Sequence, residues 1–194
     1  MARLILVRHG ESEGNRDRTF TQSSEVPLTH LGRQQAETAA AEIRKRHAPR
    51  RVISSPYRRA HQTAEIIATA IGLEVEFESD LREQSFGIFA GQPYDSLLAD
   101  AAYHDGPRWG WRPEGGESLI DVAARVIPAV ERIADHAGDE EIVVVSHGGV
   151  MLAICAHARG GWDGVAVSPN CGIVLLDAEP GRWVLDGTGT TPPK

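Results

Sequence analysis

The chain has 194 residues and a mass of 21.0 kDa, with 41% hydrophobic and 24% charged residues. These values are typical of a folded domain and exclude a disordered chain, and no apolar run reaches the roughly 18 residues of a membrane-spanning helix. We expect a single domain over residues 1–194 in the cytoplasm, because the start lacks a signal-peptide pattern and two cysteines cannot form a disulfide framework.

Charge is unevenly distributed along the chain. The formal net charge is −7, which argues against a general nucleic-acid-binding protein. Residues 1–60 carry a net charge of +6, whereas residues 61–194 carry −13. Several of the early arginines are expected on solvated helix faces. The local basic cluster nevertheless favours a small anionic ligand held in one place, with no nucleic acid or membrane as partner.

Strands and helices alternate in the predicted pattern. In the first half of the chain we expect a strand at 4–7, a helix at 29–47, a strand at 51–54, a helix at 55–71 and a strand at 74–77. In the second half we expect a helix at about 118–136, a strand at 142–145, a helix at about 149–158 and a hairpin of strands 173–176 and 183–185. Ser55 is expected to cap its helix, with Pro56 as the first helical residue. This order predicts an α/β fold, a three-layer α/β/α sandwich with a mostly parallel central sheet.

The segment from about 85 to 117 is rich in Gly, Pro and Trp and is too long for a simple connection. We expect it to form a lid over a site, with one helix near 95–102. Trp109 and Trp111, with Arg108 and Arg112, either form a wall for the organic part of a substrate or pack beneath the lid. The tail at about 188–194 is expected to be frayed.

Two predicted strands end in similar signals. The first leads into Arg8, His9 and Gly10, and the strand at 142–145 leads into Ser146, His147 and two glycines. Ligands of parallel sheets bind beyond the carboxyl ends of the strands. A third strand end supplies Arg58 at the start of a helix, where planar guanidinium groups and backbone N–H groups favour phosphate. Together these residues predict a phosphate site with an imidazole nucleophile.

At this point the sequence resembles the histidine phosphatase superfamily, in its phosphoglycerate-mutase-like branch 1. The matching segments run in the family's order over residues 3 to about 155: Leu6-Val7-Arg8-His9-Gly10-Glu11-Ser12, Asn15, Pro27-Leu28-Thr29, Leu31-Gly32-Arg33-Gln34-Gln35-Ala36, Ser54-Ser55-Pro56-Tyr57-Arg58-Arg59-Ala60, Gln62-Thr63-Ala64, Leu81-Arg82-Glu83, Phe86-Gly87, Gly115-Gly116-Glu117-Ser118 and Val145-Ser146-His147-Gly148-Gly149.

The resemblance implies a metal-independent phosphomonoesterase that needs no cofactor. His9 would attack phosphorus to give a phosphohistidine, and Arg8, Arg58 and His147 would surround the phosphoryl oxygens. Glu83 would protonate the leaving group and later activate water. The same resemblance assigns Asn15, Thr21 and Gly148 to the phosphate or substrate site.

Two departures from the family pattern lie in the loop after Thr21. Gln22 stands where the family usually has Gly, and Glu25 where it usually has Asp, so the backbone of this loop is expected to differ.

Two alternatives to the phosphatase stay open. One is a cofactor-dependent phosphoglycerate mutase, which the absence of lysine between 46 and 193 and the short spacing from Glu83 to His147 disfavour. The other is a binding module on the same fold without catalysis. The sequence lacks the loop motif of cysteine-dependent phosphatases, a nucleotide-binding P-loop and the residue spacings of a metal site. Cys155 is expected to be a small buried hydrophobe. The expected partner is a small phosphate ester. A homodimer is compatible with the Trp-rich lid or the late strands.

Overall fold

A six-stranded sheet forms the centre of the computed structural model, which describes residues 1–21 and 23–186. The strands lie in the order β3-β2-β4-β1-β5-β6. Strands β3, β2, β4 and β1 are parallel, and β5 and β6 add an antiparallel hairpin beside β1. Their bounds are β1 Ala2–Arg8, β2 Arg51–Ser54, β3 Val75–Phe77, β4 Glu141–Ser146, β5 Ile173–Glu179 and β6 Arg182–Asp186.

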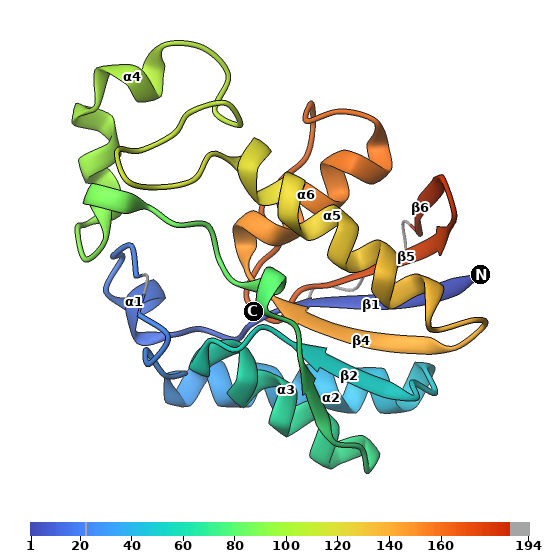
Figure 1. The fold of residues 1–194 in the computed structure, drawn as a ribbon. Helices are drawn as coiled ribbons and strands as arrows, with labels where there is room; N and C mark the ends of the chain where they lie inside the picture. Colours follow the sequence, from blue (N-terminus) through green and yellow to red (C-terminus); the bar gives the residue numbers. More distant parts are fainter. Residues whose placement is uncertain (22, 187–194) are drawn as a thin grey trace.

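Helices cover both faces of this sheet (Figure 1). On one face, α5 and α6 pack on the side chains of Leu4, Leu6 and Val144. On the other face, α2 and α3 pack on Ile5 and Val143. Because successive strand residues point to opposite faces, these strands are apolar throughout, as a sheet buried on both sides requires. The helices are α1 Glu13–Arg16, α2 His30–Arg46, α3 Arg58–Ile71, α4 Ala101–His104, α5 Leu119–Asp135 and α6 Gly148–Arg159.

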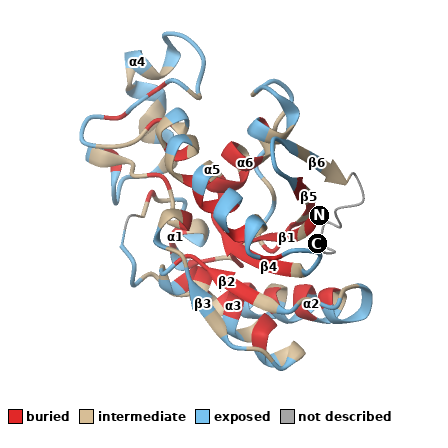
Figure 2. Ribbon diagram, turned by 45° about the vertical axis from the view of Figure 1, so that its right-hand side comes forward, coloured by how far each residue is buried: buried red, intermediate tan, exposed pale blue. Residues whose placement is uncertain are grey.

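The predicted three-layer fold is therefore confirmed, and the buried residues concentrate in its strands and in the inner faces of its helices (Figure 2). The helix caps follow the sequence in two places. The Thr29 hydroxyl accepts the Gly32 N–H at the start of α2, and Ser118 with Asp121 forms a capping box at the start of α5. Pro128 lies inside α5 without ending it.

The start of α3 differs from the prediction. Its first residue is Arg58, and the residue that precedes the helix is Tyr57 rather than Ser55. Ser55 instead accepts the Tyr57 N–H and contacts His147 through its hydroxyl. A turn at Pro56 and Tyr57 therefore separates β2 from α3. This shift of two residues decides which arginine faces the site.

The predicted lid lies beside the carboxyl ends of β1 and β4 and extends outward to α4 (Figure 1). In place of one helix near 95–102 it contains 3-10 turns at Gly87–Phe89 and Tyr94–Ala99, followed by the short α4. Phe20, Phe89 and Trp111 form a small core of its own, against which Phe86 and Tyr94 pack. The lid is thus anchored to the loop that follows α1, through Phe20.

Two sequence predictions concern residues outside the described part of the chain: the effect of Gln22 and the frayed tail at about 188–194. Within residues 1–21 and 23–186, no helix has the length and apolar composition needed to span a membrane.

Candidate active site

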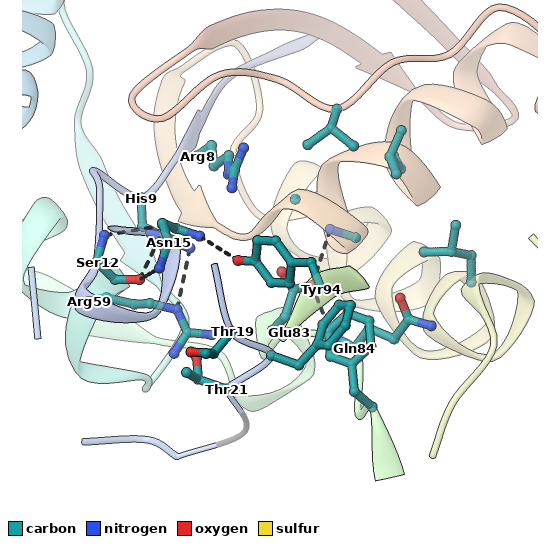
Figure 3. A pocket seen from close by; sticks show the side chains of 17 residues that line it. Arg8, His9, Ser12, Asn15, Thr19, Thr21, Arg59, Glu83, Gln84 and Tyr94 are labelled. Atoms are coloured by element: carbon teal, nitrogen blue, oxygen red, sulfur yellow. Dashed lines mark hydrogen bonds between the residues drawn. The ribbon is translucent and has the colours of Figure 1, made fainter. Parts of the chain in front are cut away.

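A cleft of about 280 Å³ opens at the carboxyl ends of β1 and β4, between these strands and the lid (Figure 3). Strands β1 and β4 are parallel neighbours in which Arg8 is opposite Ser146. The residues that follow them, His9 and His147, are therefore adjacent, and their ring centroids are 5.1 Å apart. The sheet register alone brings the two predicted histidines together.

His9 is held as a neutral imidazole with its Nε2 lone pair available. Its Nδ1 lies 2.7 Å from the Gly10 carbonyl oxygen, which only accepts hydrogen bonds, so Nδ1 carries the proton. The ring is 2% exposed. Burial, followed by the charges of Arg59 and Arg8, holds the pKa of His9 well below its usual value. The imidazole of His9 is therefore unprotonated at Nε2 at neutral pH.

Arg59, rather than Arg58, enters this site. The Nε of Arg59 donates to Nε2 of His9 at 3.3 Å, its side chain is 3% exposed, and it lines the cleft (Figure 3). Arg58 is exposed and does not line the cleft, so the prediction that Arg58 holds phosphate is wrong in its placement. Neighbouring residues of a helix point about 100° apart. Once α3 begins at Arg58, its second residue faces His9.

Arg8 places a second, partly buried cation at the cleft. Its Nη1 donates to the Ser168 carbonyl oxygen at 2.7 Å, and its Nε is buried without a partner among the described residues. Burial lowers the pKa of Arg8, while the nearby Glu83 carboxylate raises it. A guanidinium remains charged in a protein, so an unpartnered buried N–H of this group favours an anion beside it.

His147 lies beside His9, and the two ring centroids are 5.1 Å apart. It is fully buried, and its Nε2 lies 2.7 Å from the Ser55 hydroxyl oxygen. Its Nδ1 has no partner among the described residues. Burial first, and then the charge of Arg59, holds the pKa of His147 well below its usual value. The ring is therefore neutral, with one nitrogen fixed by Ser55.

Glu83 faces the same cleft from the loop after the 3-10 turn Ser79–Leu81. Its Oε1 accepts the N–H groups of Gln84 at 2.9 Å and of Gly149 at 3.1 Å. Gly149 lies in the first turn of α6, whose N-terminal N–H groups favour a carboxylate. A Cβ at Gly149 would lie 2.7 Å from Oε1, so only glycine permits this approach.

An ion pair behind Glu83 holds its loop in place. Arg125 of α5 pairs with Glu117 at 2.9 Å, and it also donates to the carbonyl oxygens of Asp80, Arg82 and Glu83. The Glu117 carboxylate accepts the Ser85 N–H at 2.9 Å. These contacts fix the backbone on both sides of Glu83. In the sequence, Glu117 stands out only as part of a matching motif, and no signal links Arg125 to the site.

Asn15 lies beside His9 in a small polar network. Its amide donates to the Tyr94 hydroxyl at 3.1 Å, and its oxygen accepts from Ser12 and from Asn170 (Figure 3). Asn170 also donates to the His9 carbonyl oxygen at 3.0 Å. Tyr94 and Asn170 were missed by the sequence analysis because both lie in segments without regular periodicity.

Thr21 and Gly148 line the cleft, as the resemblance implied. The sequence left open whether the tryptophans and arginines of the lid form a wall of the cleft or pack beneath the lid, and none of the four lines the cleft. Trp111 is buried in the lid core, and Trp109 stacks on Trp162 with ring centroids 6.1 Å apart. Arg108 and Arg112 are exposed, and neither lines the cleft. The residues that line the outer cleft instead are Phe20, Phe86, Tyr94, Leu119, Leu152 and Val167.

The two cysteines lie apart from this chemistry. Both are free thiols, and neither lines the cleft. Burial raises the pKa of Cys155 to about 11, and that of Cys171 to about 12. Neither thiol ionises near neutral pH. Cys171 is buried, whereas Cys155, which was predicted to be a buried hydrophobe, is only partly buried. In the described residues no group of three or more His, Cys, Asp or Glu side chains is arranged to hold a metal ion.

Comparison with known proteins identifies the family. The model of the histidine phosphatase superfamily (branch 1) matches residues 4–191. The glucosyl-3-phosphoglycerate phosphatase of Mycobacterium tuberculosis is 36% identical over 95% of this chain and 92% of its own. Phosphoglycerate mutase-like protein 4 of Arabidopsis thaliana is 38% identical over 81% of this chain and 71% of its own.

Among solved structures, the phosphoserine phosphatase of Entamoeba histolytica in complex with 3-phosphoglyceric acid superposes with a TM-score of 0.87 at 26% identity, covering 98% of both chains. Relatives named as phosphatases of small phosphorylated metabolites confirm the predicted enzyme class and give the mutase less support. The strand-end histidines, the fold and the family model agree, and the chain belongs to the histidine phosphatase superfamily, branch 1.

Proposed function

We propose that this protein is a metal-independent phosphomonoesterase that acts through a phosphohistidine on a small phosphorylated metabolite. The observation that carries the proposal is the state of His9. Its Nδ1 donates to the Gly10 carbonyl oxygen, its pKa is lowered by burial, and its Nε2 lies beside Arg59 in the cleft. A neutral imidazole with Nε2 free of a proton is the form that attacks phosphorus.

In the first step, Nε2 of His9 forms a bond to phosphorus while the bond from phosphorus to the ester oxygen breaks. The electron pair of that bond goes to the leaving oxygen, which takes a proton from the Glu83 carboxyl. Arg8 and Arg59 donate to the non-bridging oxygens, on which negative charge is spread in the transition state. Arg59 is buried and Arg8 is partly buried, and charge–charge interactions are stronger in such surroundings than in water.

In the second step, water attacks the phosphorus of the phosphohistidine. The Glu83 carboxylate accepts a proton from this water, and the phosphorus–nitrogen electron pair returns to Nε2 of His9. Inorganic phosphate then leaves, and both residues have regained their starting protonation. Because Oε1 of Glu83 is fixed by the N–H groups of Gln84 and Gly149, Oε2 is the oxygen that carries the proton in this scheme.

His147 and Asn15 have supporting roles in this proposal. With the Ser55 hydroxyl donating to Nε2, the proton of His147 resides on Nδ1, which has no other partner in the described residues and donates to a phosphoryl oxygen. Asn15 offers a neutral amide at the same end of the cleft, held by Ser12 and Tyr94. Neither group adds charge, so the two arginines balance a phosphate dianion.

A cytoplasmic location is also part of the proposal, because both cysteines are free thiols, as is usual in a reducing compartment.

The direct test is phosphate release from a panel of phosphomonoesters in the presence of EDTA, with His9→Ala as the control. The proposal predicts release by the wild-type protein and none by the variant. Release that persists in His9→Ala contradicts the mechanism. No release from any ester, combined with phosphate transfer between monophosphoglycerates primed by bisphosphoglycerate, identifies a mutase instead. If neither phosphate release nor phosphate transfer is detected, the result favours the binding module without catalysis.

A further inference from the structure

The cleft divides into a charged floor and an uncharged outer part. Arg8, Arg59 and Glu83 are the charged residues that line it in the described part of the chain, and all three belong to the phosphoryl site. The outer part presents the rings of Phe20, Phe86 and Tyr94 and the aliphatic side chains of Leu119, Leu152 and Val167. Polar contacts there come from uncharged groups, such as the amide of Gln84 and the hydroxyl of Thr19.

From this lining we propose that the physiological substrates are phosphate monoesters of uncharged, partly apolar alcohols or phenols, and that a carboxylate next to the ester is disfavoured. This inference rests on the proposed phosphatase function and names its substrate class. It separates this protein from relatives whose names specify carboxylate-bearing substrates, glucosyl-3-phosphoglycerate and phosphoserine.

Charge balance is the first argument. A phosphate dianion is matched by the two guanidinium groups of Arg8 and Arg59, and both are already placed around His9. A substrate carboxylate would then lie among rings and aliphatic groups with no cation to replace its lost water. Leaving a charged group unpaired in such a place is expected to lower kcat/KM about tenfold to hundredfold, which corresponds to about 1.4–2.8 kcal/mol.

The basic residues near the cleft are committed elsewhere. The guanidinium of Arg18 lies 5.9 Å from the centre of the Tyr94 ring, which lines the cleft, and it pairs with Asp95 at 3.2 Å. Arg112 pairs with Asp121 at the start of α5. The sequence has no lysine or arginine from 19 to 32 or from 83 to 107, and these ranges include the loop of Thr21 and the part of the lid that carries Phe86 and Tyr94.

The surface of the outer cleft also favours an apolar face on the ligand. The ring centroids of Phe20 and Phe86 are 4.5 Å apart, and those of Phe20 and Tyr94 are 4.7 Å apart. The rings are tilted by 36° and 58° against each other, and together they form an aromatic lining that makes apolar contacts with a ligand. The Tyr94 hydroxyl accepts from Asn15 and keeps its own hydrogen to donate to a substrate hydroxyl.

The experiment compares two matched pairs of esters. One pair is 4-carbamoylphenyl phosphate against 4-carboxyphenyl phosphate, which have similar shape and differ in charge. The other is glycerol 3-phosphate against 3-phosphoglycerate, which differ by a hydroxymethyl group in place of a carboxylate. We expect kcat/KM to be at least about tenfold higher for the uncharged member of each pair. Equal values, or a preference for the carboxylates, overturn the proposal.

A designed cation supplies the matched control. Val167 lines the cleft and is 53% exposed, so a long polar side chain fits there without disturbing the core. Val167→Lys is expected to narrow or reverse the preference for the uncharged ester in both pairs. Val167→Gln is expected to change kcat/KM by the same factor for both members of a pair. If Val167→Gln shifts the ratio as much as Val167→Lys, charge is not the cause. Arg18→Gln tests whether Arg18 binds a substrate carboxylate. A lower kcat/KM for the carboxylate-bearing esters in this variant would contradict the inference that Arg18 is engaged by Asp95.

Calorimetric binding of the same esters to His9→Ala separates the two levels of the proposal. Suppose that His9→Ala binds the uncharged esters more tightly but the wild-type protein hydrolyses none of the esters. That result contradicts the proposed phosphatase activity and supports the proposed preference for uncharged ligands. Turnover with no difference in binding or kcat/KM between pair members supports the phosphatase and contradicts the selectivity.

Discussion

The Nε of Arg59 lies 3.3 Å from Nε2 of His9, whereas the side chain of Arg58, one residue earlier, is exposed outside the cleft. The two adjacent arginines are therefore a natural control for each other. Removing a preorganised donor to the transition state costs about 10²–10³ in kcat. We predict a loss of this size for Arg59→Ala and a change within about twofold for Arg58→Ala, because an exposed side chain away from the cleft contributes little.

Steady-state kinetics on one ester, with the fold checked by circular dichroism, measures this difference. A large loss in Arg58→Ala together with a small one in Arg59→Ala would show that the helix register described here is wrong.

Glu83→Gln tests the general acid. Glutamine keeps the shape and removes the transferable proton, so the loss is expected to grow as the leaving group becomes more basic. We predict a large loss on alkyl phosphates and a small one on 4-nitrophenyl phosphate, whose leaving group needs little protonation. The measurement is kcat/KM over a series of esters, plotted against the acidity of the leaving group. Equal losses across the series would assign proton donation to another group.

Arg125 is predicted to be a positioning residue that acts through Glu83. Its guanidinium donates to the carbonyl oxygens of Arg82 and Glu83 and pairs with Glu117. In Arg125→Met the Glu83 loop loses these contacts, so the dependence on leaving-group acidity should steepen, in the same direction as in Glu83→Gln and to a smaller extent.

A purely structural role would lower the melting temperature of Arg125→Met and leave that dependence unchanged. Arg132→Met is the matched control, because Arg132 also lies on α5 and contacts Asp80 and Glu78 but does not donate to Glu83. It should leave the leaving-group dependence unaltered.

The buried histidines make stability depend on pH. Burial and the nearby arginines hold the pKa values of His9 and His147 well below that of an unfolded histidine, about 6.5. The unfolded chain therefore binds protons below pH 6.5 that the folded chain does not, and the free energy of unfolding falls as the pH drops through this range. Each imidazole that stays neutral at pH 5.5 accounts for about 1.4 kcal/mol of this loss relative to pH 7.5.

Urea unfolding of the wild-type protein, His9→Gln and His147→Gln at pH 7.5 and 5.5 measures this contribution. Each substitution should reduce the pH-dependent loss by about 1.4 kcal/mol, whatever it does to stability at pH 7.5. A loss of the same size in all three proteins would mean that the histidines are already protonated in the folded state at pH 5.5.

Much of the fold and part of the site could be predicted from the sequence, because apolar strands and the residues at their ends carry strong local signals. His9 and His147 follow β1 and β4, and they lie together because these two strands are parallel neighbours in register. The choice between Arg58 and Arg59 depends on the residue at which α3 begins. A helix boundary is uncertain by two residues from sequence, and one residue is enough to turn a side chain away.

Other parts of the site depend on tertiary packing. Trp111 is buried in the lid core rather than in the cleft, and this follows from its contacts with Phe89 and Tyr103. Asn170 reaches the His9 carbonyl oxygen across 161 positions of sequence from a loop with no motif. Such contacts between irregular segments leave no periodic pattern, so only the folded structure reveals them.

The most direct test of the central claim is to identify the atom that carries the phosphoryl group. The wild-type protein would be mixed with an ester for milliseconds, quenched in alkali to preserve phosphohistidine, and digested, with His9→Ala treated in parallel. Nδ1 of His9 is hydrogen-bonded to the Gly10 carbonyl oxygen, and Nε2 faces Arg59. We therefore predict Nε2-phosphohistidine in the peptide that contains His9 and no phosphohistidine in the variant. Phosphate on Nδ1, on His147, or on no histidine while turnover proceeds would contradict it.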